Sequence, residues 1–176
     1  MKTVLSFIFF TILTASVFGQ EYKPVDSKSE VTFTIKNFGI NTNGSFKGLK
    51  GAIKFDPNNL STASFNVSVD VNTVNTGIDA RDNHLKKEEY FNAEKYSTIN
   101  FTSTGVKKDN QGYIITGQLT IKGVSKTESF PFTVASENGG TLFTGSFSIN
   151  RKDFGVGGSS AVLGSNVDID LKVFAQ

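Results

Sequence analysis

The 176-residue chain has no cysteine, no tryptophan, one methionine and one histidine. Without cysteine it has no disulfide, no thiolate metal ligand and no cysteine nucleophile. Its stability must therefore come from packing and backbone hydrogen bonds. The single histidine, His84, has no clustered partner, and metal sites usually need several His, Cys or carboxylate ligands. We therefore expect no metal.

An excess of charge of one sign is also lacking. The chain carries 18 Lys+Arg against 16 Asp+Glu, a formal net charge of +2, and these residues are scattered along it. A protein that binds nucleic acid should instead show a basic patch or stripe. We therefore expect no nucleic-acid partner.

No apolar run is long enough to cross a membrane comfortably, which takes about 20 residues. The longest begins at Val4 and ends at Leu13, after the basic residue Lys2, and polarity rises again after Gly19. This three-part pattern is typical of a secretory signal peptide. We expect residues 1–19 to be cleaved, the exported domain to be residues 20–176, and no integral membrane segment to remain.

Phenylalanine, in contrast, is abundant, with 17 residues. So many large side chains need a large interior, or a cavity that accepts an apolar ligand. Apolar and polar residues alternate strictly over 31–36, 65–72 and 167–173. Such alternation places one face of each strand in an apolar interior and the other in water.

Further strands are predicted at 46–55, 99–101, 113–121, 130–134 and 143–149, with bends or bulges at Gly48 and Gly51. Turn signals separate the strands at 56–59, 109–112 and 137–140. About eight antiparallel strands result, each with one polar face. This favours a single closed β-barrel, which leaves no exposed edge, while a β-sandwich stays open as an alternative.

The segment from Gly77 to Tyr96 breaks the alternation. Its charge is dense and β-branched residues are nearly absent. We predict a short helix from Asp79 to about Glu89, lying across one end of the barrel.

The chain also resembles the YceI-like family. The stretch RDNHL at Arg81–Leu85 is similar to the hallmark of that family. Four further stretches carry the resemblance, in the expected order between Tyr22 and Ala175: Tyr90–Asn92, Tyr96–Ser103, Gly117–Lys126 and Ile149–Gly157.

The resemblance implies a lipocalin-like barrel that holds a polyisoprenoid or similar lipid in its lumen. It also implies a periplasmic or secreted bacterial protein with no catalytic residues and no cofactor beyond the lipid ligand. We expect a monomer or homodimer. The residues predicted to line the lumen are Phe33, Ile35, Phe46, Ile53, Phe55, Phe65, Val67, Val69, Phe101, Leu119, Ile121 and Phe147.

A second group of residues is predicted at the rim, in structural roles: Arg81, Asp82, His84, Leu85, Phe91 and Arg151. Arg151 and Asp153 are expected to share one face of a strand and to form an ion pair or a turn contact. Residues 155–158 lack the Lys-Ser/Thr and the following helix of a phosphate loop, so an irregular loop at the rim is expected there.

Two alternatives stay open. In one, the core is solid and the loops bind a protein partner, as in a stress or surface protein. In the other, an enzyme uses the rim residues Arg81, Asp82, His84 and Arg151. No Gly-x-Ser-x-Gly elbow supports a serine hydrolase, so we expect binding rather than catalysis.

Overall fold

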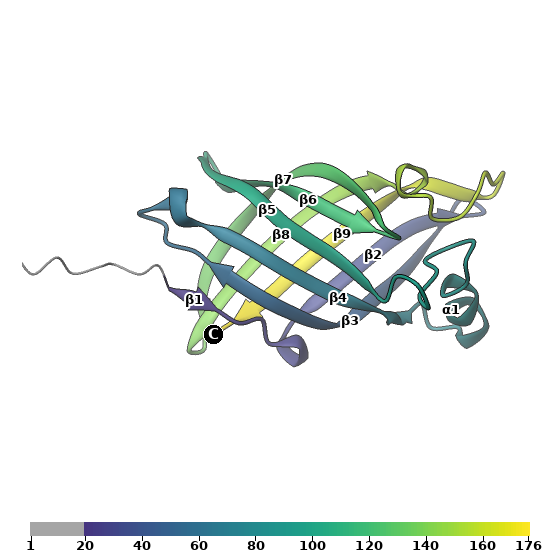
Figure 1. Cartoon of the computed structure of the whole chain (residues 1–176), viewed down its shortest axis with the longest axis horizontal. Coiled ribbons are helices and arrows are strands. Elements are labelled where there is room, and N and C mark those ends of the chain that lie inside the picture. The colour runs from purple at the N-terminus through teal and green to yellow at the C-terminus, as the bar shows by residue number, and fades with distance from the viewer. Residues whose placement is uncertain (1–19) are drawn as a thin grey trace, which may run out of the picture.

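The computed structural model describes residues 20–176, so the expected signal peptide lies outside the described residues. Nine strands, one α-helix and three short 3₁₀ helices form this part of the chain (Figure 1). The strands are β1 (Glu21–Tyr22), β2 (Glu30–Asn37), β3 (Ile40–Lys54), β4 (Ser64–Asn75), β5 (Thr98–Asp109), β6 (Gly112–Ile121), β7 (Val124–Glu137), β8 (Gly140–Asn150) and β9 (Leu163–Ala175). The helices are η1 (Asp26–Lys28), η2 (Leu60–Thr62), α1 (Asp79–Leu85) and η3 (Arg151–Phe154).

Strands β2 to β9 form a closed, up-and-down antiparallel barrel. Each pairs with the next in the chain, and β9 returns to pair with β2, with Val31 opposite Leu171. The pairing of β3 with β4, which places Ile53 opposite Phe65, completes the ring. This confirms the predicted barrel of eight strands and excludes the sandwich. Every long strand is paired on both sides, so none presents a free edge.

The first described residues pair with the last part of β3, beyond the residues that pair with β2. Strand β1 pairs with the end of β3, where Tyr22 lies opposite Ile53. The Lys23 amide then donates to the Gln176 carbonyl at 2.8 Å, and the Val25 amide donates to the Phe174 carbonyl at 2.8 Å. The two ends of the domain are thereby joined along one part of the barrel wall.

The alternation of the sequence becomes the two faces of this wall. On β2, the side chains of Val31 and Phe33 line the interior. On the outer face, polar side chains pair across strands: Thr116 with Ser129 at 2.9 Å, Gln118 with Thr127 at 2.8 Å, and Thr120 with Ser125 at 2.8 Å. Apolar burial and cross-strand polar pairing therefore act together to set the register.

Glycine allows β3 to bend where the sequence predicted it. The register between β3 and β4 shifts between Lys47 and Lys50, and Gly48 lies there with a φ of 74°. A Cβ atom at Gly51 would collide with the carbonyl oxygen of Asn66 on β4. The predicted bulge is confirmed at Gly48, where it lets one long strand curve around the barrel, whereas at Gly51 glycine is explained by the close approach of β4.

The predicted helix exists but is shorter than expected. It begins at Asp79, as predicted, and ends at Leu85 rather than near Glu89. Beyond Leu85 the chain folds into tight turns, in which the Phe91 amide donates to the Leu85 carbonyl at 3.0 Å. These turns bring the Phe91 ring back to within 5.6 Å of the Phe46 ring inside the barrel, and a longer straight helix would carry it past this contact.

The expectation that Arg151 and Asp153 share a face of one strand is wrong. Strand β8 ends at Asn150, whose side chain accepts a hydrogen bond from the Lys152 amide at 3.0 Å and so starts η3. Arg151 is buried in this turn of 3₁₀ helix, whereas Asp153 is exposed. The asparagine cap ends the strand, a local effect that alternation alone does not reveal.

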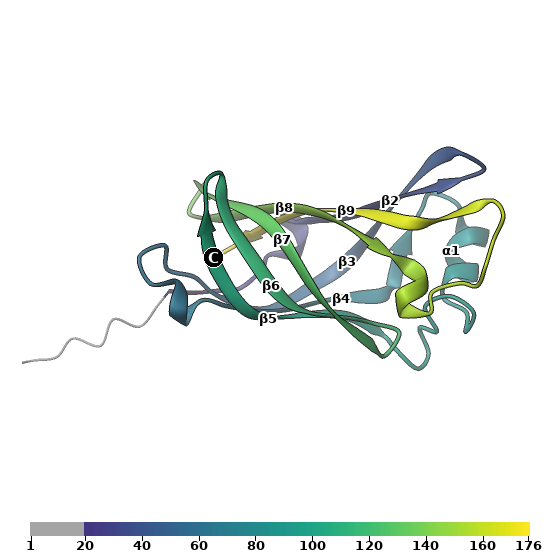
Figure 2. The ribbon, with the colours of Figure 1, turned by 90° about the horizontal axis from the view of Figure 1, so that it is seen from above.

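The two ends of the barrel differ (Figures 1 and 2). At one end, here called the closed end, lie β1, the 55–63 loop, the two hairpin turns at 109–112 and 137–140, and the C-terminus. At the other, the open end, lie α1, the 150–163 loop and the β2–β3 and β6–β7 turns. Within residues 20–176, no helix has the length and apolar character needed to cross a membrane.

Candidate functional site

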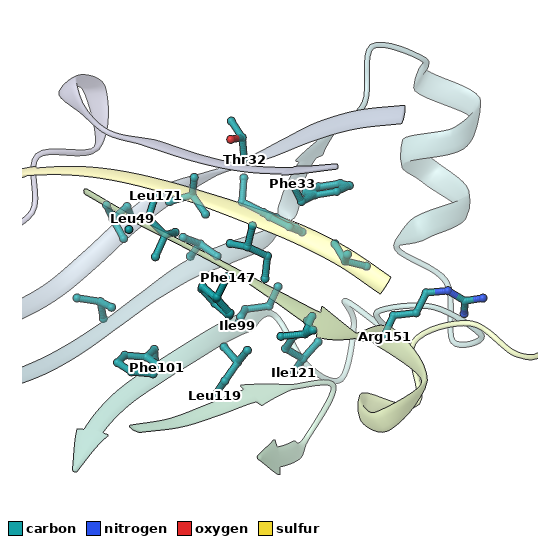
Figure 3. A pocket seen from close by; sticks show the side chains of 18 of the residues that line it. Thr32, Phe33, Leu49, Ile99, Phe101, Leu119, Ile121, Phe147, Arg151 and Leu171 are labelled. Atoms are coloured by element: carbon teal, nitrogen blue, oxygen red, sulfur yellow. The ribbon is translucent and has the colours of Figure 1, made fainter. Parts of the chain in front are cut away.

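A cavity of about 250 Å³ runs inside the barrel. This is many times the roughly 10–15 Å³ needed to hold one water molecule. Apolar side chains from all eight barrel strands line it, including Phe33, Leu49, Ile99, Leu119 and Leu171 (Figure 3). A large and nearly uniformly apolar space of this kind favours an apolar ligand over water.

Eleven of the twelve residues predicted to line the lumen border this cavity. They are Phe33, Ile35, Phe46, Ile53, Phe65, Val67, Val69, Phe101, Leu119, Ile121 and Phe147. The exception is Phe55, which follows the last residue of β3 and lies beyond the cavity, at the closed end. The structure thus brings together side chains from β2, β3, β4, β5, β6 and β8 that are far apart in the sequence.

Phe55 instead forms the centre of an aromatic cluster. Its side chain is 3% exposed, and its ring meets those of Tyr113, Phe132 and Phe143 edge to face at 5.0, 6.0 and 5.8 Å. Phe65, on β4, completes the group with a ring distance of 6.4 Å. Edge-to-face packing of several buried rings therefore fills the interior of the barrel at this end.

Several lining residues were not predicted. The largest group lies on β9, where Val167, Ile169, Leu171 and Val173 alternate inward. The same alternation that identified β9 as a strand could have assigned these four side chains to the lumen. Thr76 and Tyr90, at the open end, have no such signal, because they follow the strand or lie in turns.

Arg151 lies where the cavity reaches the open end and is the most deeply buried charged residue among 20–176, with 4% exposure. Its guanidinium donates to backbone carbonyls only: Nε to Gly164 at 2.8 Å, Nη1 to Val156 at 2.7 Å, and both Nη atoms to Gly158 at 3.2 Å. A further bond, from Nη2 to Leu163, measures 3.3 Å. Arg151 therefore anchors the loop that follows η3.

Arg81 is the second arginine that borders the cavity. Its Nε donates to Thr76 Oγ1 and its Nη2 to the Thr76 carbonyl, both at 2.7 Å. The buried Asp82 carboxylate accepts from the hydroxyl and from the amide of Thr76. The result is a tight network that fixes α1 to the end of β4, while Arg81 Nη1 has no hydrogen bond within residues 20–176.

The two arginines make the open end polar but form no ion pair there. Within residues 20–176, the salt bridges involve neither Arg81 nor Arg151. Leu85 and Phe91, also predicted at the rim, both border the cavity and pack against the buried cluster that contains Phe46. The cavity is therefore apolar along its length and carries two cationic groups at one end.

His84 and Asp82 do not border the cavity. The His84 ring packs against Tyr90 at 5.0 Å, and its Nδ1 lies 3.7 Å from a Glu89 carboxylate oxygen at the surface. Within the described residues, no three His, Cys, Asp or Glu side chains gather as metal ligands would. Of the six predicted rim residues, four therefore border the cavity: Arg81, Leu85, Phe91 and Arg151. Asp82 and His84 do not.

One carboxyl group has a shifted pKa. Burial raises the pKa of Glu128 on β7 above its usual value of 4.5, and the nearby charge of Asp153 raises it further. Glu128 does not border the cavity. Its shift therefore reflects burial on β7 beside η3, which packs against that strand, rather than a group that lines the cavity.

An up-and-down barrel of eight strands around an internal apolar cavity is the architecture of proteins that hold a small ligand in the barrel. The match to a known family is specific. The model of the YceI-like domain matches residues 22–175, so the chain belongs to the YceI-like domain family.

Relatives in several bacteria agree with this assignment. Protein YceI of Salmonella agona is 38% identical over 131 residues, which cover 71% of this chain and 68% of that protein. A relative from Pectobacterium carotovorum is 40% identical over the same length.

Solved structures share the fold. Burkholderia cenocepacia BcnA superposes with a TM-score of 0.82 at 28% identity, over 87% of this chain and 99% of that one. A polyisoprenoid-binding domain from Saccharophagus degradans, implicated in plant cell wall breakdown, gives a TM-score of 0.71 at 18% identity. That match covers 88% of this chain and 97% of the other.

Proposed function

We propose that this protein binds a long apolar lipid of the polyisoprenoid type inside its barrel, and that it acts by binding rather than by catalysis. The observation that carries the proposal is the internal cavity of about 250 Å³ with its apolar walls. The cavity argues against the alternative of a solid core. The polyisoprenoid-binding neighbour from Saccharophagus degradans supports the ligand class.

The energetics fit an apolar chain. Burial of each methylene is worth about 0.8 kcal/mol, so a long hydrocarbon needs no charged clamp to bind tightly. A polar or charged group deep in the cavity would be costly, because Val67, Phe101 and Leu119 offer it no hydrogen-bond partner. We therefore place the hydrocarbon in the barrel and the polar end of the lipid at the open end.

Arg81 is the donor best placed to meet that polar end. Its Nη1 has no partner within residues 20–176, whereas the guanidinium of Arg151 is occupied by four backbone carbonyls. We propose that Arg81 contacts the lipid headgroup and that Arg151 shapes the loop around it.

We also propose a site of action outside the cytoplasm. The signal-peptide pattern over residues 1–19 supports export, and we propose that the mature protein works in the periplasm or outside the cell. A carrier or sequestering protein for an apolar lipid is needed there, because such a lipid does not cross water unaided.

The proposal is tested by a charge placed on either face of β4. Val67 points into the cavity, and its neighbour Asn66 is exposed on the outer face. The Val67→Arg variant should lose uptake of a polyprenol almost completely, because a guanidinium would be buried among apolar walls. Binding is measured by native mass spectrometry after incubation with the polyprenol.

The matched control is Asn66→Arg, which adds the same charge to the same strand and should bind as the wild type does. Circular dichroism checks that both variants keep the barrel. Normal uptake by a folded Val67→Arg protein would contradict binding inside the barrel.

A further inference from the structure

The large hydrophobic side chains that stay exposed gather at the open end. Among residues 20–176 there are five: Phe38, Ile40, Ile78, Val124 and Val162. They lie on the β2–β3 turn, just before α1, on the β6–β7 turn and just before β9, all of which belong to the open end (Figure 2). No such side chain is exposed at the closed end of the described barrel. Single exposed apolar residues are ordinary, but their gathering at one end needs a cause.

Phe38 is the most exposed of them, at 73%, and the fold does not explain it. With Gly39 it forms the two-residue turn between β2 and β3, where its φ is 51°. Asparagine and glycine suit this backbone, and a bulky residue there is unusual. At the closed end, the matching turn of β7 and β8 uses Asn138 at a φ of 44°. The sequence thus has a phenylalanine where turn formation favours asparagine.

The exposed residues are continuous with the cavity. Phe38 donates its amide to the Val162 carbonyl at 2.8 Å, so the two residues lie side by side. Ile40, 72% exposed, pairs with Asn37, and Asn37 and Leu163 both border the cavity. Leu163, Val162 and Phe38 therefore form an apolar path from the cavity to the tip of the β2–β3 turn.

Charge does not explain the surface. The connections at the open end, 37–40, 75–98, 121–124 and 150–163, contain seven basic and six acidic residues. The basic ones are Arg81, Lys86, Lys87, Lys95, Lys122, Arg151 and Lys152, and the acidic ones are Asp79, Asp82, Glu88, Glu89, Glu94 and Asp153. A nearly neutral rim with protruding apolar side chains suits insertion into a membrane interface more than attraction to anionic lipid.

We infer that the open end docks on a lipid bilayer, with Phe38, Ile40 and Val162 inserted among the lipids. The inference rests on the proposed function, since it gives the apolar cargo a path between membrane and cavity that avoids water. The bilayer is the partner that fits, because the exposed apolar residues surround the mouth through which that cargo must pass.

The test is flotation of the mature protein with phosphatidylcholine vesicles, at low and at high salt. The wild type should float with the vesicles at both salt concentrations. The double variant Phe38→Asn, Ile40→Thr should partition about tenfold less, because two inserted apolar side chains are lost. Its melting temperature should equal or exceed that of the wild type, since asparagine suits the turn and threonine suits a strand.

Transfer of a polyprenol from the vesicles to the protein gives a second readout. The double variant should take up the same final amount, about tenfold more slowly. Adding Asn138→Phe to the double variant builds the same Phe-Gly turn at the closed end, and it should not restore the rate. Unchanged flotation and transfer in the double variant would overturn the inference.

Two further outcomes separate docking from lipid binding. A wild type that carries lipid but does not float would refute docking and leave the proposed function standing. A wild type that floats but never takes up lipid would support docking and refute the cavity proposal. The wild type could also fail to bind vesicles and instead form a dimer that the double variant does not form. This result would show that a second copy covers this face, and it also overturns the inference.

Discussion

The two ends of this barrel are built from different chemistry. At the closed end, rings interlock: Phe55 meets Phe65, Tyr113, Phe132 and Phe143 edge to face. At the open end, loops are held by arginines that donate to backbone carbonyls, and large apolar side chains face water. On the proposed function, stability depends on one end of the barrel and ligand access on the other, with the cavity between them.

The largest effect should come from breaking the closed end. Phe55→Ala removes the central ring of a tightly packed cluster, and we expect a loss of about 3–5 kcal/mol of unfolding free energy. Phe147→Ala, at the cavity wall, should cost only about half as much, because its ring already borders free space. Urea denaturation of both variants measures the difference. Equal losses would show that the two regions are packed alike.

The open end should depend on one buried cation. Arg151→Met leaves the carbonyls of Val156, Gly158, Leu163 and Gly164 without their donor, and we expect a loss of about 2–4 kcal/mol. Hydrogen exchange should rise across residues 156–164 and stay low around Phe55. Arg151→Lys should recover only part of the protection, since an ammonium lacks the planar fork of a guanidinium. Loss of protection at both ends alike would contradict separate control of the two.

The smallest effect on stability is expected from Arg81, the residue proposed to contact the lipid headgroup. Arg81→Met should lower stability by only about 1 kcal/mol, since Thr76 and Asp82 remain paired with each other. Its affinity for a polyprenol should stay unchanged, while its affinity for a polyprenyl phosphate should fall about fivefold, as a charge-assisted hydrogen bond is lost. Isothermal titration with the two lipids measures the ratio. The same fall for both lipids would place Arg81 in a purely structural role.

Much of the barrel is predictable because alternation is a local property. Residues 31–36 and 167–173 each show which face is apolar without reference to any other strand, and the fold confirms their assignment. The turns at 109–112 and 137–140 were predicted correctly for the same reason, since asparagine and glycine favour turns through their own backbone conformation.

The rest depended on contacts that are distant in sequence. Phe55 continues the alternation of Ile53, and only the rings of β6, β7 and β8 around it show that it closes the barrel. Arg151 satisfies carbonyls up to thirteen residues away, which no spacing rule reveals. Phe38 lies in the turn between the end of β2 and the start of β3, and that this turn shares one end of the barrel with the other exposed apolar residues is visible only in the three-dimensional structure.

Lipid binding inside the barrel is tested most directly by native mass spectrometry of the purified mature protein, followed by solvent extraction and identification of any lipid. We expect one apolar chain compound per barrel, released when the protein unfolds and absent from the Val67→Arg variant. A protein that is empty as purified and also refuses an added polyprenol would contradict lipid binding inside the barrel.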